Sequence, residues 1–274
     1  MREASIHSTL ILKGSEIVKK NTCIWDLSGT LFRPRSDSMS LQELADFSFL
    51  FLMWSGKKLP SRLDIITYTL LSLIGEQQES EPSQIIRDHR GQPVPEIICA
   101  YLSGRINSLE AKEQALSFYE SWAPQHIAAE DQIAIRRMIE AFFDPMALVT
   151  CMKPIEPIVK VFRKTLNTPN NIFILSNWDQ DSFKPFYDKY KDSVFQGIDR
   201  EHFVISADTG YVKPQKGIYT YLLAEKNLTP KECFFVDDQQ ENIAAAQRQG
   251  IEGMQCKEEN SSELEAELQR QGLL

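Results

Sequence analysis

Four short runs of apolar residues, each bounded by polar or turn residues, predict buried β-strands. The runs span residues 22–26, 171–177, 202–206 and 233–238. Apolar residues that recur every three or four positions predict helices between and after the later runs. These helices span residues 152–166, 217–227 and 241–250. Strands that alternate with helices of this length indicate an α/β fold, in which helices cover both faces of a Rossmann-like parallel sheet.

Residues 34–150 follow a different pattern, because they lack strand signals and repeat apolar residues at helical spacing. The expected helices span residues 40–56, 61–77, 108–122 and 128–143. We therefore expect an inserted all-α helical domain over 34–150, within an α/β core domain formed by 1–33 and 151–274. Pro34 and the Met-Lys-Pro stretch at 152–154 mark the two hinges.

Bulk composition restricts the class of protein and its partners. With 42% hydrophobic residues, the chain can bury a large core, so we expect a globular protein. A net charge of -8 argues against nucleic acid and against a membrane as partners, since anionic surfaces are bound by basic proteins. A small-molecule substrate fits better, and nothing in the sequence specifies an oligomeric state. The acidic stretch 257–271 is expected to form a solvated helix.

Apolar stretches and cysteines bear on the compartment. The apolar patch near the N-terminus is too short for a signal peptide, and the stretch at 65–75 is too short to span a bilayer. The five cysteines are scattered and form no CxxC pair, which is typical of reduced, buried thiols. We expect a cytoplasmic protein.

Polar side chains follow three of the apolar runs at the point where each run ends. These residues are Asp26, Ser176, Asn177, Asp237 and Asp238, and Lys213 lies in a loop after the 202–206 run. In an open parallel sheet, ligands bind beyond the carboxyl ends of the strands, so we expect these side chains to form one site.

The chemistry of this set is consistent with a phosphoryl group. Clustered carboxylates repel one another unless a divalent cation holds them, and oxygen-only ligands suit Mg2+. The cation and Lys213 would neutralise a phosphoryl group, and the Ser176 hydroxyl would bind its oxygens. Asp26 would then be free to attack phosphorus and form an aspartyl-phosphate. Gly29 and Thr30 suit a tight turn beside the transferred group.

Four short motifs follow one another along the chain: Asp26-Leu-Ser-Gly-Thr, the Ile-Leu-Ser-Asn run that ends at Asn177, Lys213-Pro214, and Val-Asp-Asp-Gln-Gln-Glu-Asn from Val236. In order and spacing they resemble the motifs of the haloacid dehalogenase-like (HAD) superfamily. The resemblance covers residues 20–33 and about 152–256. The helical insertion falls between the first two motifs, where one subclass of the family places a helical cap.

The resemblance implies a role for each matched residue. Asp26 would be the nucleophile and a metal ligand, and Ser28 would offer its backbone carbonyl to Mg2+. Asp237 and Asp238 would complete the metal site. Ser176, Asn177 and Lys213 would bind the substrate, and Ser28 and Lys213 would join Asp26 as catalytic residues. The implied activity is a Mg2+-dependent phosphatase acting on a small phosphorylated metabolite.

Position 28 departs from the family pattern. Family phosphatases usually carry an aspartate there, which serves as general acid and base, and a serine is a very weak acid. One alternative is therefore a catalytically impaired member that binds or senses a metabolite. Another is a phosphonate-cleaving enzyme that uses Lys57 or Lys58 as a Schiff base. A halide-cleaving enzyme is disfavoured, because such members lack the paired acids Asp237 and Asp238.

Overall fold

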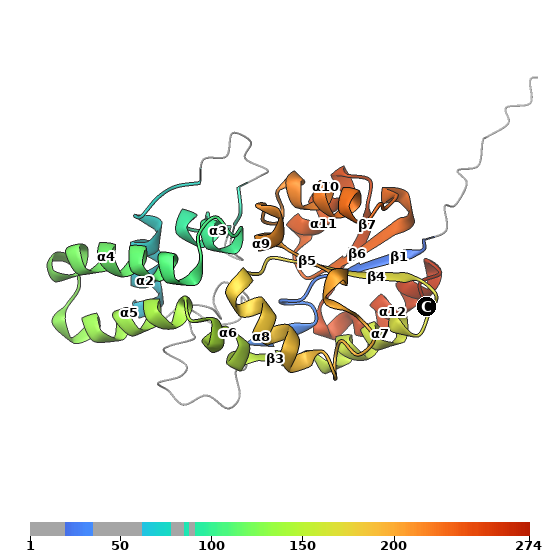
Figure 1. Ribbon diagram of the computed structural model, residues 1–274, viewed down its shortest axis with the longest axis horizontal. Coiled ribbons are helices and arrows are strands. Elements are labelled where there is room, and N and C mark those ends of the chain that lie inside the picture. The colour runs from blue at the N-terminus through green and yellow to red at the C-terminus, as the bar shows by residue number, and fades with distance from the viewer. Residues whose placement is uncertain (1–19, 35–61, 78–84, 88–90) are drawn as a thin grey trace, which may run out of the picture.

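The computed structural model describes residues 20–34, 62–77, 85–87 and 91–274, and it has a five-stranded parallel sheet at its centre (Figure 1). The strand order is β5-β4-β1-β6-β7. The strands are β1 (Thr22–Trp25), β4 (Asn171–Ser176), β5 (Phe203–Ile205), β6 (Cys233–Asp237) and β7 (Glu252–Gln255). Strand β1 is central, with β4 and β6 paired to it on either side, and it is buried along its whole length.

Helices cover both faces of the sheet, as the sequence predicts (Figure 1). Alternate residues of β1 point to opposite faces: Trp25 packs with the helices on one side and Ile24 with those on the other. The Trp25 face is covered by α7 (Glu156–Leu166), α8 (Gln180–Tyr190) and α12 (Ser261–Arg270). The Ile24 face is covered by α10 (Lys216–Glu225) and α11 (Gln240–Arg248).

A second group of helices, the helical segment, lies at one end of the molecule (Figure 1). Its members are α2 (Arg62–Ser72), α3 (Glu96–Leu102), α4 (Ser108–His126), α5 (Ala129–Phe142) and α6 (Pro145–Cys151). Helices α2 to α5 share a hydrophobic cluster that includes Ile135, Ile139 and Phe143. The buried side chains of α6 belong instead to the core on the Trp25 face of the sheet. A capping box fixes the start of α4, since Asn107 and Glu110 exchange hydrogen bonds. The helix expected over 40–56 lies outside the described residues.

Two short strands join the helical segment to the sheet-forming part of the chain. Strand β2 (Phe32–Pro34) pairs antiparallel with β3 (Met152–Pro154), so the chain leaves and returns at adjacent points. The prediction of a helix from residue 152 is therefore wrong at its start, because α7 begins only at Glu156. Residues 152–154 are extended and pair with β2 instead of forming a helical turn.

The helical segment also touches the rest of the chain close to the end of β5. Residues Ser206–Thr209 form the short helix α9 there. The Ser206 hydroxyl donates to the carbonyl oxygen of Leu102 at 2.5 Å. Gly104 has a φ of +71°, and a Cβ added to it would lie 2.6 Å from the carbonyl oxygen of Ala207. Only glycine therefore allows the two backbones to approach this closely.

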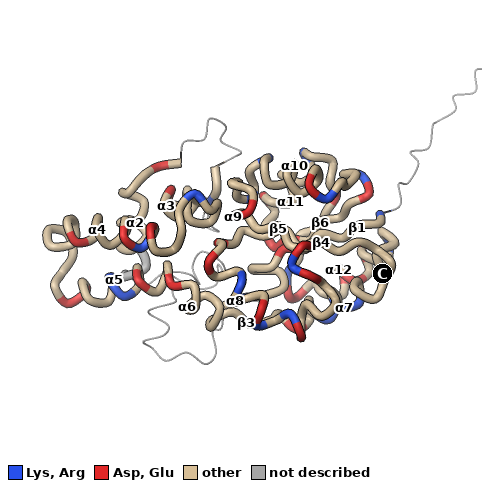
Figure 2. Tube along the Cα trace, in the orientation of Figure 1, with Lys and Arg blue, Asp and Glu red and all other residues tan. Residues whose placement is uncertain are grey.

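Some features differ from the expectations drawn from the sequence. The edge strand β7 has the sequence Glu-Gly-Met-Gln, which carries no apolar run. Helix α12 is not simply solvated, because Leu264 and Leu268 are buried in the main core. All five cysteines are buried and none of them forms a disulfide within the described residues, as predicted. Lysines and arginines are spread among the acidic residues over both parts of the molecule (Figure 2). Among the described residues, no helix combines the length and the apolar character needed to cross a bilayer.

Candidate active site

The carboxyl ends of three adjacent strands bring the predicted polar residues together. Asp26 directly follows β1, Ser176 ends β4, and Asp237 ends β6. Because β1 lies between β4 and β6, Asp26 lies between the other two residues. The Asp26 N–H donates to the carbonyl oxygen of Val236 at 2.9 Å and so continues the pairing with β6.

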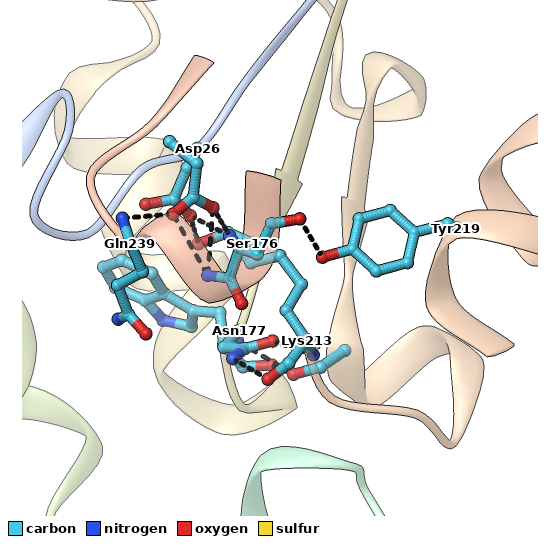
Figure 3. Close-up of polar contacts among 10 residues, drawn as sticks. Asp26, Ser176, Asn177, Lys213, Tyr219 and Gln239 are labelled. Atoms are coloured by element: carbon cyan, nitrogen blue, oxygen red, sulfur yellow. Dashed lines mark hydrogen bonds and ion pairs between the residues drawn. The ribbon is translucent and has the colours of Figure 1, made fainter. Parts of the chain in front are cut away.

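The ammonium group of Lys213 lies at the centre of the site (Figure 3). Its Nζ is 2.6 Å from Asp26 Oδ1 and 2.7 Å from Asp237 Oδ2. The side chain is only 2% exposed, so both ion pairs are shielded from water. Burial alone opposes the charged form, but Asp237 and Asp26 outweigh it, and the pKa of Lys213 lies above its usual value. Lys213 therefore remains a cation in this site.

Asp26 is a buried carboxylate held at one of its two oxygens. The Ser176 hydroxyl donates to Oδ1 at 2.9 Å, and Lys213 contacts the same oxygen. Burial raises the pKa of Asp26 to about 6, although Lys213 opposes the shift. The carboxylate is thus ionised at neutral pH and poorly solvated, and these two properties favour a nucleophile.

The paired acids Asp237 and Asp238 have different surroundings. Asp237 accepts hydrogen bonds from the Gln239 N–H at 2.8 Å and from Asn242 Nδ2 at 3.0 and 3.1 Å. Together with Lys213, these donors engage both of its oxygens. In contrast, Asp238 Oδ1 is buried and has no hydrogen-bond partner among the described residues. Burial, with Asp237 and Asp26 nearby, raises the pKa of Asp238 well above its usual value.

These carboxylates fit a divalent cation. Asp26, Asp237 and Asp238 each offer an oxygen, and these oxygens lie within 4.8 Å of one another. The unpartnered oxygen of Asp238 is a costly arrangement unless a ligand completes it. An oxygen-only donor set favours a hard cation such as Mg2+. Gly29 leaves room for this group, since a Cβ there would lie 2.3 Å from Asp238 Oδ2.

Comparison with known proteins is consistent with this geometry. The sequence model of haloacid dehalogenase-like hydrolases matches residues 108–255, which is more than half of the chain. The chain belongs to this family. The family prediction made from the four motifs is confirmed at this level.

Solved structures of HAD enzymes share the fold of this HAD-like hydrolase. One HAD family enzyme from Bacteroides thetaiotaomicron has a TM-score of 0.53 and 16% identity, covering 87% of this chain and 94% of that one. The same enzyme in complex with magnesium and inorganic phosphate gives a TM-score of 0.50 at 16% identity and the same coverage. A predicted HAD-like hydrolase from Porphyromonas gingivalis has a TM-score of 0.51 and 19% identity, covering 92% and 98%.

Two predicted site residues of the HAD-like hydrolase lie at the margin of this cluster. The side chain of Asn177 hydrogen-bonds to the backbone of Lys213, in both directions. Ser28 is 3% exposed and lies in the turn after Asp26, where its backbone forms a bridge with Phe32. The structure thus joins Asp26, Ser176, Lys213 and Asp237 directly by hydrogen bonds, and the roles assigned to them stay predictions.

Sequence reasoning missed two contributors to the site. The backbone N–H of Gln239 donates to Asp237, and no side-chain pattern could indicate it. The Tyr219 hydroxyl donates to the carbonyl oxygen of Asn242 at 3.0 Å and thereby supports the residue that holds Asp237 (Figure 3). A tyrosine on the apolar face of a predicted helix is only weak evidence of a role in a site. A buried tyrosine hydroxyl usually has a hydrogen-bond partner, wherever it lies in the protein.

Proposed function

We propose that this HAD-like hydrolase is a Mg2+-dependent phosphatase that acts on a small phosphorylated metabolite through an aspartyl-phosphate on Asp26. One observation carries the proposal: Lys213 and Ser176 both contact Asp26 Oδ1 inside a cluster of three carboxylates. A cation, a hydroxyl and a strand-end carboxylate then converge where a phosphoryl group would lie. The HAD enzyme crystallised with magnesium and inorganic phosphate adds support.

The contacts of Asp26 suggest which atom attacks. Because Lys213 and Ser176 engage Oδ1, we assign the attack on phosphorus to Oδ2. The bond from Oδ2 to phosphorus forms as the bond to the leaving-group oxygen breaks, and that oxygen keeps the electron pair. Water then attacks the aspartyl-phosphate, which releases inorganic phosphate and restores the carboxylate. Lys213 and Ser176 would stabilise the phosphoryl oxygens in both steps.

The metal-binding roles follow from the different hydrogen bonding of the paired acids Asp237 and Asp238. Asp238 would be the principal ligand, because its buried Oδ1 meets no hydrogen-bond donor in the part of the chain that the structure describes. Asp26 and the backbone carbonyl of Ser28 would complete the protein ligands. Asp237 would mainly hold Lys213, since Lys213, Asn242 and Gln239 occupy its oxygens. Bound Mg2+ would supply positive charge that neutralises the carboxylates and the phosphoryl group.

The helical segment would act as the cap that selects the substrate, with domain boundaries at 34 and 150 as the sequence predicts. A cavity of about 180 Å3 lies between this segment and the loop that carries Lys213. Cys99, Ser103 and Arg105 line it from the segment, and Tyr211 and Gln215 line it from the loop. The paired strands β2 and β3 would be the hinge of this cap.

The substitution Asp26→Asn tests the nucleophile. We expect turnover of an aryl phosphate, measured with Mg2+, to fall on the order of a thousandfold or more, as it does when other enzymes lose their nucleophile. Asp192→Asn is the matched control, because Asp192 is an exposed acid and its loss should leave turnover unchanged. If Asp26→Asn keeps its turnover and its thermal unfolding temperature, Asp26 is not the nucleophile.

Ser28 favours a second candidate, a catalytically impaired family member that binds or senses a metabolite. The residue stands where family phosphatases usually carry the general acid, and its hydroxyl is a poor substitute. The phosphonate-cleaving alternative would need Lys57 or Lys58, which lie outside the described residues. Tight binding of a phosphorylated ligand without turnover, in a panel of small phosphate esters, would favour the binding role over the phosphatase.

A further inference from the structure

The position of Lys213 poses a structural problem. The residue belongs to neither helix nor strand, because it lies in the loop between α9 and α10. Its side chain has four rotatable bonds, and yet Nζ lies within 2.7 Å of both Asp26 and Asp237. A long side chain can hold its charged end this closely only if its backbone is fixed as well.

Asn177 supplies a direct hold on that backbone. Its Nδ2 donates to the carbonyl oxygen of Lys213 at 3.1 Å, and its Oδ1 accepts from the N–H of Lys213 at 2.7 Å. Figure 3 shows Asn177 beside Lys213, below Asp26 and Ser176. A primary amide is suited to this pairing, because it offers a donor and an acceptor on one planar group. The two bonds replace the backbone ladder that a loop lacks.

Other contacts fix the shape of the loop but act locally. The N–H of Val212 donates to Gln215 Oε1 at 2.8 Å, and the N–H of Gln215 donates to the Val212 carbonyl at 2.8 Å. These bonds close the turn around Lys213. Asn177 instead ties the turn to the end of β4, one residue after Ser176. The same strand end thus supplies a hydroxyl to Asp26 and an amide to the Lys213 backbone.

We propose that Asn177 is a positioning residue that acts through Lys213, and not the substrate-binding residue that the sequence suggests. The inference rests on the proposed phosphatase function, because it assigns Lys213 to the phosphoryl group. The Asn177 amide uses one N–H donor and its oxygen acceptor to bind the Lys213 backbone. Its effect on turnover therefore comes from the position that it gives to the Lys213 ammonium group. Asn177 therefore contributes only while Lys213 is present.

A double-mutant cycle tests this dependence. We expect Asn177→Ala to lower kcat/KM for an aryl phosphate about tenfold to a hundredfold, since a displacement near 1 Å can cost that much. In a Lys213→Met background, the same change should lower kcat/KM by no more than about twofold, within the usual error of additivity. A loss that persists in full without Lys213 would overturn the proposal, because it would mean direct contact with the substrate.

A measurement without turnover keeps the proposal testable if Lys213→Met does not fold or if no variant turns over substrate. The lysine ammonium groups of 15N-labelled protein can be observed by NMR, and the Lys213 signal is assigned by its loss in Lys213→Arg. Asn177→Ala should shift or broaden that signal alone. Asn167→Ala is the control, since Asn167 Nδ2 donates to the Arg163 carbonyl oxygen of α7, away from the site. An unchanged Lys213 signal in Asn177→Ala would overturn the proposal, whereas absent turnover with a shifted signal would count against the phosphatase function alone.

Discussion

At the scale of single residues, the proposed phosphatase function predicts that Ser28 limits which leaving groups the site can serve. We expect Ser28→Asp to raise kcat/KM for an alkyl phosphate at least about tenfold, because general acid catalysis contributes roughly 100- to 10,000-fold elsewhere. The gain should be much smaller for an aryl phosphate, whose leaving group departs without a proton. Rates on the two substrates, with Asp26→Asn/Ser28→Asp as the inactive control, measure the difference.

Two other outcomes of the Ser28→Asp measurement would point elsewhere. An equal loss of rate on both substrates would mean that the serine belongs to a tuned mechanism and that no acid is missing. Inactivity of both the native and the Ser28→Asp proteins, with tight binding of a phosphorylated ligand, would favour the binding role.

The sequence predicts that the polar residues of the candidate site lie together at one edge of the sheet, and the structure brings Asp26, Ser176, Lys213 and Asp237 into contact, but the sequence could not give the individual contacts. Asp26, Ser176 and Asp237 each follow an apolar run, and parallel strands place such residues at one edge of a sheet. The division between Asp237 and Asp238 depends on the direction of each side chain after β6, which two adjacent aspartates in a sequence do not reveal. The contact of Asn177 with the Lys213 backbone could not be predicted either, since only the fold brings the Lys213 loop against the end of β4.

At the scale of elements, the approach of the Gly104 turn to Ala207 determines how the helical segment docks. Gly104→Ala should lower the free energy of unfolding by about 1–3 kcal/mol, through strain at positive φ and a clash with a backbone oxygen. Gly197→Ala is the matched control, because Gly197 has a φ of +91° and no described residue lies within 4 Å of an added Cβ. Denaturant unfolding of both variants isolates the docking contact. Equal losses would mean that backbone strain alone acts at Gly104.

Elements with a strong apolar pattern were predicted well, and those fixed by pairing were not. Strand β1 carries a continuous apolar run because it is buried on both faces, and helix α7 carries helical periodicity because it is buried on one face. Strand β7 lies at the edge of the sheet and has no apolar run, so only its pairing with β6 defines it. Strand β3 likewise depends on β2, which is distant in sequence.

At the scale of the whole molecule, the carboxylate cluster links stability to pH and to Mg2+. Folding raises the pKa of Asp26 from 3.8 to about 6 and that of Asp238 well above its usual value. Over that range the folded protein binds more protons than the unfolded chain, so these groups lower its stability as pH rises from about 4 through 6 and beyond. The proposed Mg2+ would bind the ionised carboxylates, and its stabilising effect should therefore grow over the same range.

We expect Mg2+ to raise the thermal unfolding temperature little at pH 5 and clearly at pH 7.5. At a hundredfold excess over Kd the stabilisation would be about 2.7 kcal/mol, which corresponds to roughly 5–10 °C for a chain of this size. Asp238→Asn should remove most of the effect, because it replaces the carboxylate whose oxygen is left without a partner, whereas the exposed Asp192→Asn should keep it. A Mg2+ effect that is the same at both pH values, or that survives in Asp238→Asn, would contradict a metal bound by this cluster.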